Sequence, residues 1–235
     1  MEALESNNQN KGILFLVSTP IGNYADLTLR ALRILKECDI IVCEEFKEAK
    51  KLLKFFEIEK ELLQLNEHNE KEITEETIGL LESGKNISLI SDCGTPAFAD
   101  PGNYLLNECI NRNIKVDFIP GANSVLAALV ISGFDISRFF YLGFLSQKND
   151  ERNKQLKDIG KLNRTAVIME TPYRLNTLLK SIEEILPEKK LFIGFNLTME
   201  SERQFRGTAS EILNQISTEY SEGKIKGEFV IIIDN

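Results

Sequence analysis

Short apolar runs alternate with amphipathic segments through the first half of the chain. The runs are rich in Ile, Val and Phe and are bounded by polar or turn residues, a pattern that predicts β-strands. The expected strands are GILFLVS (12–18), DIIVCE (39–44), NISLIS (86–91) and KVDFIP (115–120). Segments with helical spacing lie between them, at 26–38, 46–58, 70–84 and 103–113. This alternation of strand and helix predicts βαβ units and a mainly parallel sheet.

Two of the predicted helices carry signals at their ends. Asp26 opens the segment 26–38, and its carboxylate suits an N-cap, which accepts hydrogen bonds from the free amides of the first turn. Gly84 closes the segment 70–84 and suits the C′ position, where the backbone is left-handed. These signals set the expected limits of both helices.

The pattern changes after PGANSVLAALVISGF (120–134). The strands expected beyond it are RFFYLGF (138–144), RTAVIME (164–170), KLFIGFNLTM (190–199) and GEFVIII (227–233). The stretch FIGFNLTMESERQFRG predicts two strands that meet at a turn, and therefore antiparallel pairing within a mixed sheet. The charged stretch 146–158 predicts a solvated loop and helix.

The chain is therefore predicted to form an α/β fold with two domains. We expect a mainly parallel N-terminal sheet and a mixed C-terminal sheet, both with flanking helices. The expected limits are 1–11 for a flexible tail that is polar and aperiodic, 12–125 for the N-terminal domain and 126–235 for the C-terminal domain.

Composition adds a few constraints to this picture. Apolar residues make up 43% and charged residues 27% of the 235 residues, as in globular proteins. No apolar run is long enough to span a membrane and the polar N-terminus lacks a secretion signal, so we expect a cytoplasmic protein. The net charge of −8 argues against strong non-specific affinity for nucleic acid but allows a local basic patch.

Metal and triad chemistry are disfavoured by the residue types present. The four cysteines, Cys38, Cys43, Cys93 and Cys109, form no CxxC pair, and we expect free and mostly buried thiols and no metal site. His68 is the one histidine, and it lies in the polar stretch LNEHNEKE, where an exposed or structural position is expected. A Ser/His/Asp triad is therefore disfavoured.

Three glycine- and proline-bearing turns follow predicted strands. They are STPIGN (18–23), SDCGTPAFADPG (91–102) and PGANS (120–124). Ligands of open α/β sheets bind beyond the carboxyl ends of the strands, where glycine lets backbone amides approach closely and proline pre-orders the loop. The chain has neither GxGxxG after its first strand nor GxxxxGK[ST], which weakens a dinucleotide site and excludes a P-loop. Each turn taken alone is also compatible with an ordinary tight turn.

A family resemblance rests on motifs that keep their order and approximate spacing. VSTPIGNYADLTLRALRILKECDIIVCEE is followed by SDCGTPAFADPG, PGANSVLAAL, GFLSQK, ETPYRL and KGEFVIII. Together they resemble the tetrapyrrole (corrin/porphyrin) methylase superfamily, and within it the branch that 2′-O-methylates a cytidine of small-subunit ribosomal RNA. The resemblance runs from about residue 12 to the C-terminus.

The resemblance implies a methyltransferase that uses S-adenosylmethionine, with the cofactor in a cleft between two α/β domains. It also implies a homodimer and an acceptor in ribosomal RNA or the small ribosomal subunit. Matched position by position, the implied cofactor-binding residues are Pro20, Ile21, Gly94, Thr95, Phe98, Ser124, Val125, Thr171 and Gly227. Glycines, hydroxyls and apolar side chains suit a sulfonium with a ribose and an adenine, which needs no phosphate cradle.

Methyl transfer to a ribose hydroxyl depends on alignment and is helped by a base that takes the proton. Asp100 and Glu202 are the candidate catalytic residues. The alternative for Asp100 is an N-cap for the following helix, and for Glu202 a surface carboxylate. Lys148 and Arg174 are candidate RNA contacts, and both are also compatible with solvated surface charges.

The acceptor-side motifs depart from the branch pattern. CEEFKEAKKLL stands where the branch usually has a sequence close to AEDTRHTRKLL, so that Phe46 and Lys47 replace a Thr-Arg pair. FNLTM (195–199) stands where RELTK is usual, and GFLSQK replaces GFLPRK. Several of these changes remove basic residues suited to phosphates. The open alternatives are therefore methylation of a small molecule such as a tetrapyrrole, and a cofactor-binding relative without turnover.

Overall fold

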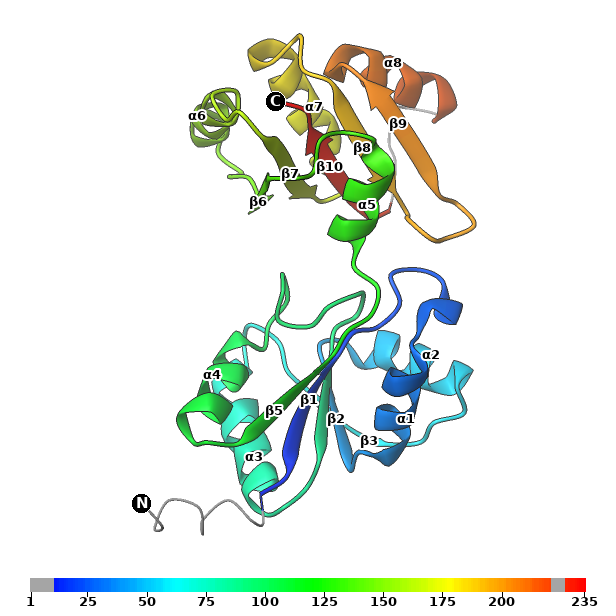
Figure 1. Cartoon of the computed structure of the whole chain (residues 1–235), viewed down its shortest axis with the longest axis vertical. Helices are drawn as coiled ribbons and strands as arrows, with labels where there is room; N and C mark the ends of the chain where they lie inside the picture. The colour runs from blue at the N-terminus through cyan, green and yellow to red at the C-terminus, as the bar shows by residue number, and fades with distance from the viewer. Residues whose placement is uncertain (1–10, 221–226) are drawn as a thin grey trace. The chain divides into compact units, whose positions relative to one another are not determined.

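The structure is a computed structural model that describes residues 11–220 and 227–235. The chain divides into two compact units, Met1–Asn123 and Ser124–Asn235, and each unit holds one five-stranded sheet (Figure 1). Residues 1–10 of the predicted N-terminal tail lie outside the described residues.

The first unit is a parallel α/β sheet. Its strands are β1 (Ile13–Val17), β2 (Ile40–Cys43), β3 (Glu61–Gln64), β4 (Ile87–Ile90) and β5 (Lys115–Ile119). They are arranged in the order β3-β2-β4-β1-β5, and every pairing is parallel, which confirms the predicted sheet. The strand β3 lies outside the predicted strands, because ELLQ is short, polar at both ends and paired on one side only.

Helices cover both faces of this sheet. They are η1 (Tyr24–Asp26, a 3₁₀ turn), α1 (Leu29–Glu37), α2 (Phe46–Phe55), α3 (Glu70–Glu82) and α4 (Asn103–Asn111). Buried apolar residues of α1 and α2 pack on one face, and those of α3 and α4 pack on the other. Strand residues therefore alternate between two cores, as expected for a sheet that is covered on both sides.

The start of α1 corrects one prediction. Asp26 is not its N-cap, because this residue belongs to the 3₁₀ turn η1. One more extended residue follows, and the hydroxyl of Thr28 then accepts a hydrogen bond from the Ala31 amide at 3.1 Å. The end of α3 follows the sequence prediction: Gly84 has a φ of 94° and donates to the Leu81 carbonyl at 3.0 Å.

The second unit has a mixed sheet. Its elements are α5 (Ser124–Ser132), β6 (Phe139–Phe144), α6 (Asn149–Ile159), β7 (Thr165–Glu170), α7 (Leu175–Ile185), β8 (Leu191–Phe195), β9 (Arg203–Gly207), α8 (Ala209–Glu219) and β10 (Phe229–Ile233). The strand order is β6-β7-β10-β8-β9, with β6 parallel to β7 and the other pairs antiparallel. This confirms the predicted mixed sheet and the hairpin of β8 and β9. The helices α7 and α8 lie outside the predicted elements.

The core of the second unit lies between its sheet and three helices. Buried residues of α6, α7 and α8 pack together with alternate residues of β7, β8 and β10 and with Phe205 of β9. The helix α5 contacts β8 and β10 (Figure 1). The other side chains of these two strands point away from that core, because side chains alternate along a strand. Among the described residues, no helix is long and apolar enough to cross a bilayer.

The N-terminus of α4 corrects the capping role considered for Asp100. The N-cap residue is Gly102, with a φ of 124°, and a Cβ atom there would lie 2.8 Å from Leu89 Cδ2. Since glycine has no side chain, the capping acceptor comes from α3: Glu70 Oε1 accepts from the Gly102 amide at 2.9 Å and from the Tyr104 amide at 3.4 Å. Asp100 is two residues too early in the chain to act as this cap.

Glu70→Ala removes this acceptor and should lower the free energy of unfolding by about 1 kcal/mol, the usual cost of a lost N-cap. Glu72→Ala is the matched control, because Glu72 lies in the same first turn of α3 but makes no described hydrogen bond to α4. Chemical denaturation of both variants measures the difference. Equal stability of the two variants would show that Glu70 does not cap α4.

Candidate functional site

The three glycine- and proline-bearing turns meet at the carboxyl edge of the first sheet, because β4, β1 and β5 are neighbours. Thr19, which is 2% exposed, joins the first turn to the central loop. Its hydroxyl accepts from the Gly94 amide at 3.1 Å and lies 3.2 Å from the Ser91 carbonyl oxygen. Its own amide donates to the Gly94 carbonyl at 2.8 Å. The two turns therefore form one rigid structure.

The third turn is tied to the central loop through Thr95. The Thr95 hydroxyl oxygen lies 3.4 Å from Ser18 Oγ and 3.3 Å from Asn123 Nδ2, which donates to it. Gly121 lies against Ser18, so closely that a Cβ atom would stand 2.9 Å from the Ser18 Cβ. One residue from each turn thus converges on a single hydroxyl.

The predicted cofactor residues of this unit divide into buried supports and accessible groups. Pro20 and Ile21 are buried, and Gly94 is buried with a φ of 88°. A Cβ atom at Gly94 would lie 3.2 Å from Ile21 Cγ2, so this position requires glycine on both conformational and steric grounds. Thr95 is half-buried, and the ring of Phe98 is 44% exposed. An exposed aromatic ring beside ordered backbone suits a flat, partly apolar ligand.

Carboxylates gather at the same edge of the sheet. Burial, and after it the negative charges of Asp100, Asp92, Glu45 and Glu67, together raise the pKa of Glu44 to about 7. Burial likewise raises the pKa of Asp92, although its Oδ1 accepts a hydrogen bond from the Glu45 amide at 3.1 Å. The edge is therefore strongly negative, a field that attracts a cationic ligand such as a sulfonium.

In the second unit, two predicted cofactor residues lie at one edge of the sheet. The register pairs Glu170 with Phe229 and Phe195 with Phe229, so Thr171 and the segment before β10 follow at the same end. A Cβ atom at Gly227 would lie 2.3 Å from Asn196 Oδ1. The structure thus brings Thr171, Gly227 and Asn196 to a common edge, with Gly227 just before the middle strand of the three, β10.

Asn196 holds this edge together. Its Oδ1 accepts from the Glu228 amide at 3.0 Å, its amide donates to the Glu228 carbonyl at 3.0 Å, and its Nδ2 donates to Ser201 Oγ at 2.9 Å. Its φ of 45° is in the left-handed region that asparagine tolerates. The asparagine that departs from the branch pattern is therefore a structural residue.

The remaining predicted residues of this unit lie on other elements. Ser124 and Val125 form the first turn of α5, with Ser124 half-buried and Val125 3% exposed. The carboxylate of Glu202 accepts from the Thr198 amide at 2.8 Å and from Gln204 Nε2 at 2.9 Å. Thr198 lies in the connection between β8 and β9, and Gln204 lies in β9, so both contacts of Glu202 are local.

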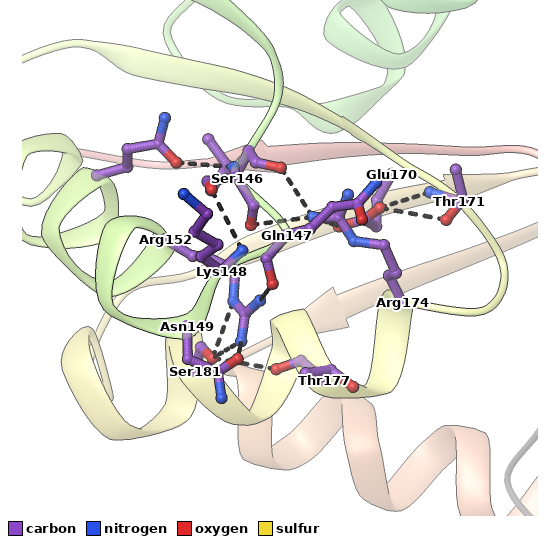
Figure 2. A network of polar contacts seen from close by, with 12 residues as sticks. Ser146, Gln147, Lys148, Asn149, Arg152, Glu170, Thr171, Arg174, Thr177 and Ser181 are labelled. Carbon is purple, nitrogen blue, oxygen red and sulfur yellow. Dashed lines mark hydrogen bonds and ion pairs between the residues drawn. The ribbon is translucent and has the colours of Figure 1, made fainter.

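A polar network supports the loop after β6, which carries GFLSQK (Figure 2). Arg174 Nη2 donates to the carbonyls of Leu145 at 2.8 Å and Ser146 at 3.2 Å, and it lies 3.2 Å from Glu170 Oε2. The Glu170 side chain is 0% exposed, and its other oxygen accepts from the Thr171 amide at 2.7 Å. The ion pair therefore links the loop, β7 and the predicted cofactor residue Thr171.

Arg152 holds the next carbonyl of the same loop. This side chain is only 4% exposed and donates to the Gln147 carbonyl at 3.3 Å, to Asn149 Oδ1 at 2.6 Å and to Ser181 Oγ at 3.2 and 3.3 Å (Figure 2). Three successive carbonyls are thus held by two arginines. Within the part of the chain that the structure describes, Arg152 has no carboxylate partner.

The two predicted RNA contacts differ in how they are engaged. The described side-chain contacts of Arg174 use Nη2, which binds the loop carbonyls and lies beside Glu170. The side chain of Lys148 is 79% exposed and pairs with Glu151 at 3.0 Å, an exposed pair that contributes little energy. Lys148 is therefore available to exchange its partner, whereas Arg174 positions the loop.

Several contributors lie outside the predicted set. They are Thr19, Glu44, Ser91, Arg152 and Asn196. A signal existed for the first three, since each directly follows or ends a predicted strand at the carboxyl edge of a parallel sheet. Arg152 lies in a stretch that is charged throughout, and its burial has no marker in that pattern.

The cysteines and His68 take no part in these clusters. Cys38, Cys43 and Cys109 are buried free thiols and Cys93 is an exposed one, while His68 is exposed. Burial raises the pKa of Cys43 to about 12, which keeps it a neutral thiol. Over residues 11–220 and 227–235, no group of His, Cys, Asp and Glu is arranged to hold a metal ion.

Comparison with known proteins gives a family match. A profile described as Tetrapyrrole (Corrin/Porphyrin) Methylases matches residues 14–213. A Bacillus subtilis (strain 168) relative named Ribosomal RNA small subunit methyltransferase I is 37% identical over 97% of this chain and 77% of its own length. A relative of the same name from Thermotoga maritima is 37% identical over 94% of this chain and 98% of its own length.

Solved structures share the fold at low identity. The native uroporphyrin III C-methyl transferase from Thermus thermophilus has a TM-score of 0.65 and 18% identity, covering 95% of this chain and 98% of its own. The cobalt precorrin-4 methyltransferase has a TM-score of 0.71 and 15% identity, covering 94% of each chain. Another structure of the Thermus enzyme is complexed with S-adenyl homocysteine, with a TM-score of 0.66, 16% identity and coverage of 95% and 98%.

Arg174→Met should lower the free energy of unfolding by about 3 kcal/mol, because it leaves the buried Glu170 carboxylate without its counter-charge. It should also accelerate amide exchange in the loop 145–148, which hydrogen-exchange mass spectrometry measures. Lys180→Met on the same helix is the matched control, since Lys180 is exposed and makes no described ion pair.

Adding Glu170→Gln to Arg174→Met should recover part of the lost stability, since it removes the unpaired charge. If Arg174→Met is as stable as Lys180→Met, the ion pair does not hold the loop.

Proposed function

The chain belongs to the tetrapyrrole (corrin/porphyrin) methylase family, and on that premise we propose that it is an S-adenosylmethionine-dependent methyltransferase of small-subunit ribosomal RNA. The proposed acceptor is the 2′-hydroxyl of a cytidine. The observation that carries the proposal is the extent of the match to relatives named Ribosomal RNA small subunit methyltransferase I, which covers 97% of this chain in one case and 94% in another. An acceptor of this kind would place the enzyme in the cytoplasm.

The residues present fit S-adenosylmethionine, which supplies a methyl group on a positively charged sulfur. In the first unit, Gly94 gives backbone access, Thr95 offers a hydroxyl and Phe98 an exposed ring. Pro20 and Ile21 support that loop from below as buried side chains. The negative edge around Glu44 favours a cation there.

In the second unit we assign cofactor contacts to Ser124, Val125, Thr171 and Gly227. Gly227 leaves no room for a side chain, and Thr171 is oriented by the Glu170 carboxylate, which accepts from its amide. These assignments follow the family pattern, and the local geometry of each residue supports them.

On the acceptor side, we assign RNA contact to Lys148 and a positioning role to Arg174. Lys148 is exposed at the end of a loop whose carbonyls are fixed by arginines, so its ammonium is presented from a defined backbone. Such lysines contact phosphates and contribute affinity rather than sequence specificity.

For proton transfer we propose the carboxylate cluster at the edge of the first sheet, to which the candidate Asp100 belongs. The oxygens of Glu202 accept hydrogen bonds from Thr198 and Gln204, so we assign Glu202 to holding its own turn. Aligning the acceptor oxygen with the methyl group would supply most of the acceleration.

A small-molecule acceptor is the second candidate, favoured by the apolar departures in the acceptor-side motifs. Phe195, where the branch usually has arginine, is 3% exposed and stacks on Phe229 at 5.1 Å. Phe46 is 37% exposed beside Lys50, whose ammonium lies 5.5 Å from the ring centroid. These positions offer fewer cations to a polyanion than the branch pattern does.

We also propose that two copies of the chain associate through β6. Phe139, Phe140, Tyr141, Leu142 and Phe144 are each 36–49% exposed on this edge strand, a long apolar strip for a surface. A register shift between Tyr141 and Gly143 interrupts the strand, which disfavours continuous sheet pairing with the partner. The contact would therefore be made by side chains.

Incubation with labelled S-adenosylmethionine and small ribosomal subunits from a strain without the corresponding enzyme should label the small-subunit RNA. Nuclease digestion and mass spectrometry should then find 2′-O-methylcytidine. Label in a tetrapyrrole and none in RNA would favour the second candidate. S-adenosylhomocysteine binding without transfer to either acceptor would indicate a relative without turnover.

Gly94→Val is the cofactor-site variant and should weaken S-adenosylhomocysteine binding at least about tenfold. Valine would be strained at the left-handed φ of this position, and its Cβ atom would crowd the side chain of Ile21. Gly79→Ala is the matched control, since a Cβ atom there meets nothing within 4 Å. Calorimetric titration measures both affinities.

Phe140→Glu combined with Phe144→Glu should convert the dimer to a monomer in light scattering, because two charges would be buried in the contact. Phe118→Glu is the control in the first unit, where Phe118 is 47% exposed. A wild-type protein that is monomeric at micromolar concentration would contradict this assembly.

A further inference from the structure

We infer that Glu44 is the base that receives the proton of the acceptor hydroxyl, and that Ser91 and Ser18 complete a polar row beside it. This inference rests on the proposed function and adds a residue to its site. The row lies at the carboxyl edge of three neighbouring strands, β2, β4 and β1.

The strand register places the three residues side by side. Val42 pairs with Leu89, and Val17 pairs with Ile90. Continuing both ladders sets Glu44 opposite Ser91, and Ser91 opposite Ser18. Residues that pair in a parallel ladder point to the same face of the sheet, so the three side chains form one row.

The face is fixed by the residues two positions earlier. Val42, Leu89 and Leu16 all pack in the core cluster between the sheet and the helices α3 and α4. Because side chains alternate along a strand, Glu44, Ser91 and Ser18 lie directly above them on that face. The N-terminus of α4 and the loop with Asp100 cover the same face, which agrees with the electrostatic interaction between Asp100 and Glu44.

Ser91 supplies an independent sign of a ligand. The residue is 3% exposed, and its Oγ is buried without a hydrogen-bond partner among the described residues. A buried hydroxyl without a partner is destabilising, and a ligand or water that donates or accepts there would supply the lost hydrogen bond. Its position in the row places Ser91 between Glu44 and Ser18.

Glu44 has the properties of a poised carboxylate. It is half-buried, and its carboxylate makes no hydrogen bond or ion pair within the described residues. The charged groups around it are all acidic: Asp92 after β4, Asp100 before α4, Glu45 before α2 and Glu67 before α3. Burial and this repulsion raise its pKa to about 7, near the value at which a base works best in neutral solution.

The chemical step balances with this assignment. The oxygen of the hydroxyl forms a bond to the methyl carbon as the sulfur–carbon bond breaks, and that electron pair stays on sulfur. The hydroxyl proton passes to the Glu44 carboxylate, which becomes neutral and no longer repels Asp100. Release of the proton to water restores the charged form.

The test compares Glu44→Gln and Glu44→Asp with Glu82→Gln, which removes an exposed carboxylate at the last residue of α3, outside the carboxylate cluster. Single-turnover methyl transfer by the wild-type protein should rise with pH through an inflection near 7. Glu44→Gln should lower the plateau rate about 10²–10⁴-fold and remove the inflection. Glu44→Asp should keep part of the rate, and Glu82→Gln should stay within about threefold of wild type.

Asp100→Asn tests which of two carboxylates, Glu44 or Asp100, receives the proton. Removing its negative charge should lower the pKa of Glu44 and move the inflection to lower pH. If Asp100→Asn abolishes the inflection and Glu44→Gln keeps it, Asp100 is the base and our assignment is overturned.

Thermal unfolding provides a measurement that does not depend on turnover. The pKa of Glu44 is raised above its ordinary value of 4.5 in the folded state, so wild-type stability should fall as pH rises from 4.5 to 7. Glu44→Gln lacks this penalty, so its Tm should exceed that of wild type by about 3 °C at pH 8 and by much less at pH 5. An equal difference at both pH values would contradict the raised pKa.

The outcomes distinguish the inference from the proposed function. Methyl transfer to RNA by wild type and unchanged transfer by Glu44→Gln would overturn the role of Glu44 alone. Absence of transfer to RNA by wild type, with S-adenosylhomocysteine still bound, would overturn the proposed function. The RNA hydroxyl would then no longer be the group whose proton Glu44 receives.

Discussion

The hydroxyl of Thr19 is the contact on which the candidate site of the first unit depends. It binds the amide of Gly94 and lies next to the carbonyl of Ser91, so the end of β1 and the loop after β4 cannot move independently. Thr95 extends the same structure to Asn123 after β5. Three loops that would each be mobile alone are thereby fixed over the sheet edge, and fixed backbone is what a ligand recognised by main-chain groups requires.

The two units achieve order at their edges by different means. In the first unit, glycines let the backbone segments of neighbouring loops pack closely. The carboxylates around Glu44 repel one another. In the second unit, charge is neutralised: Arg174 pairs with Glu170 and holds the loop after β6 (Figure 2). The first arrangement costs stability and keeps a reactive carboxylate, whereas the second provides stability to a loop that presents Lys148.

Most strands and the helices α1 to α4 were predictable because they follow from the period of the apolar residues, whereas β3, α7 and α8 were not predicted. The parallel and the mixed sheet were both predicted from that pattern. Local ends were predicted less well: Gly84 closes α3 as its type indicates, but Asp26 and Asp100 are not caps. Their places are taken by Thr28 and by a carboxylate from another helix, Glu70. A cap supplied from elsewhere in the chain leaves no local signal.

The site was predictable only in part, for the same physical reason. The glycine-bearing turns could be recognised in the sequence, because Gly94 and Gly102 have positive φ values and little room for a Cβ atom. The raised pKa of Glu44 and the lack of a hydrogen-bond partner for Ser91 Oγ among the described residues depend on which strands are neighbours. The order β2-β4-β1 cannot be deduced from the sequence of any single segment. The burial of Arg152 likewise depends on the distant Ser181.

The contacts of Phe195 and Asn196 limit which residues can replace them. Phe195 is stacked between Phe229 and, edge-on, Tyr220, and Asn196 uses both atoms of its amide in a left-handed backbone. A return to arginine and glutamate at these two positions would bury a charge and strain the backbone unless their neighbours changed first. The departure is therefore entrenched by epistasis, and transplanting the RELTK stretch into this chain would require exchanging its packing partners as a block.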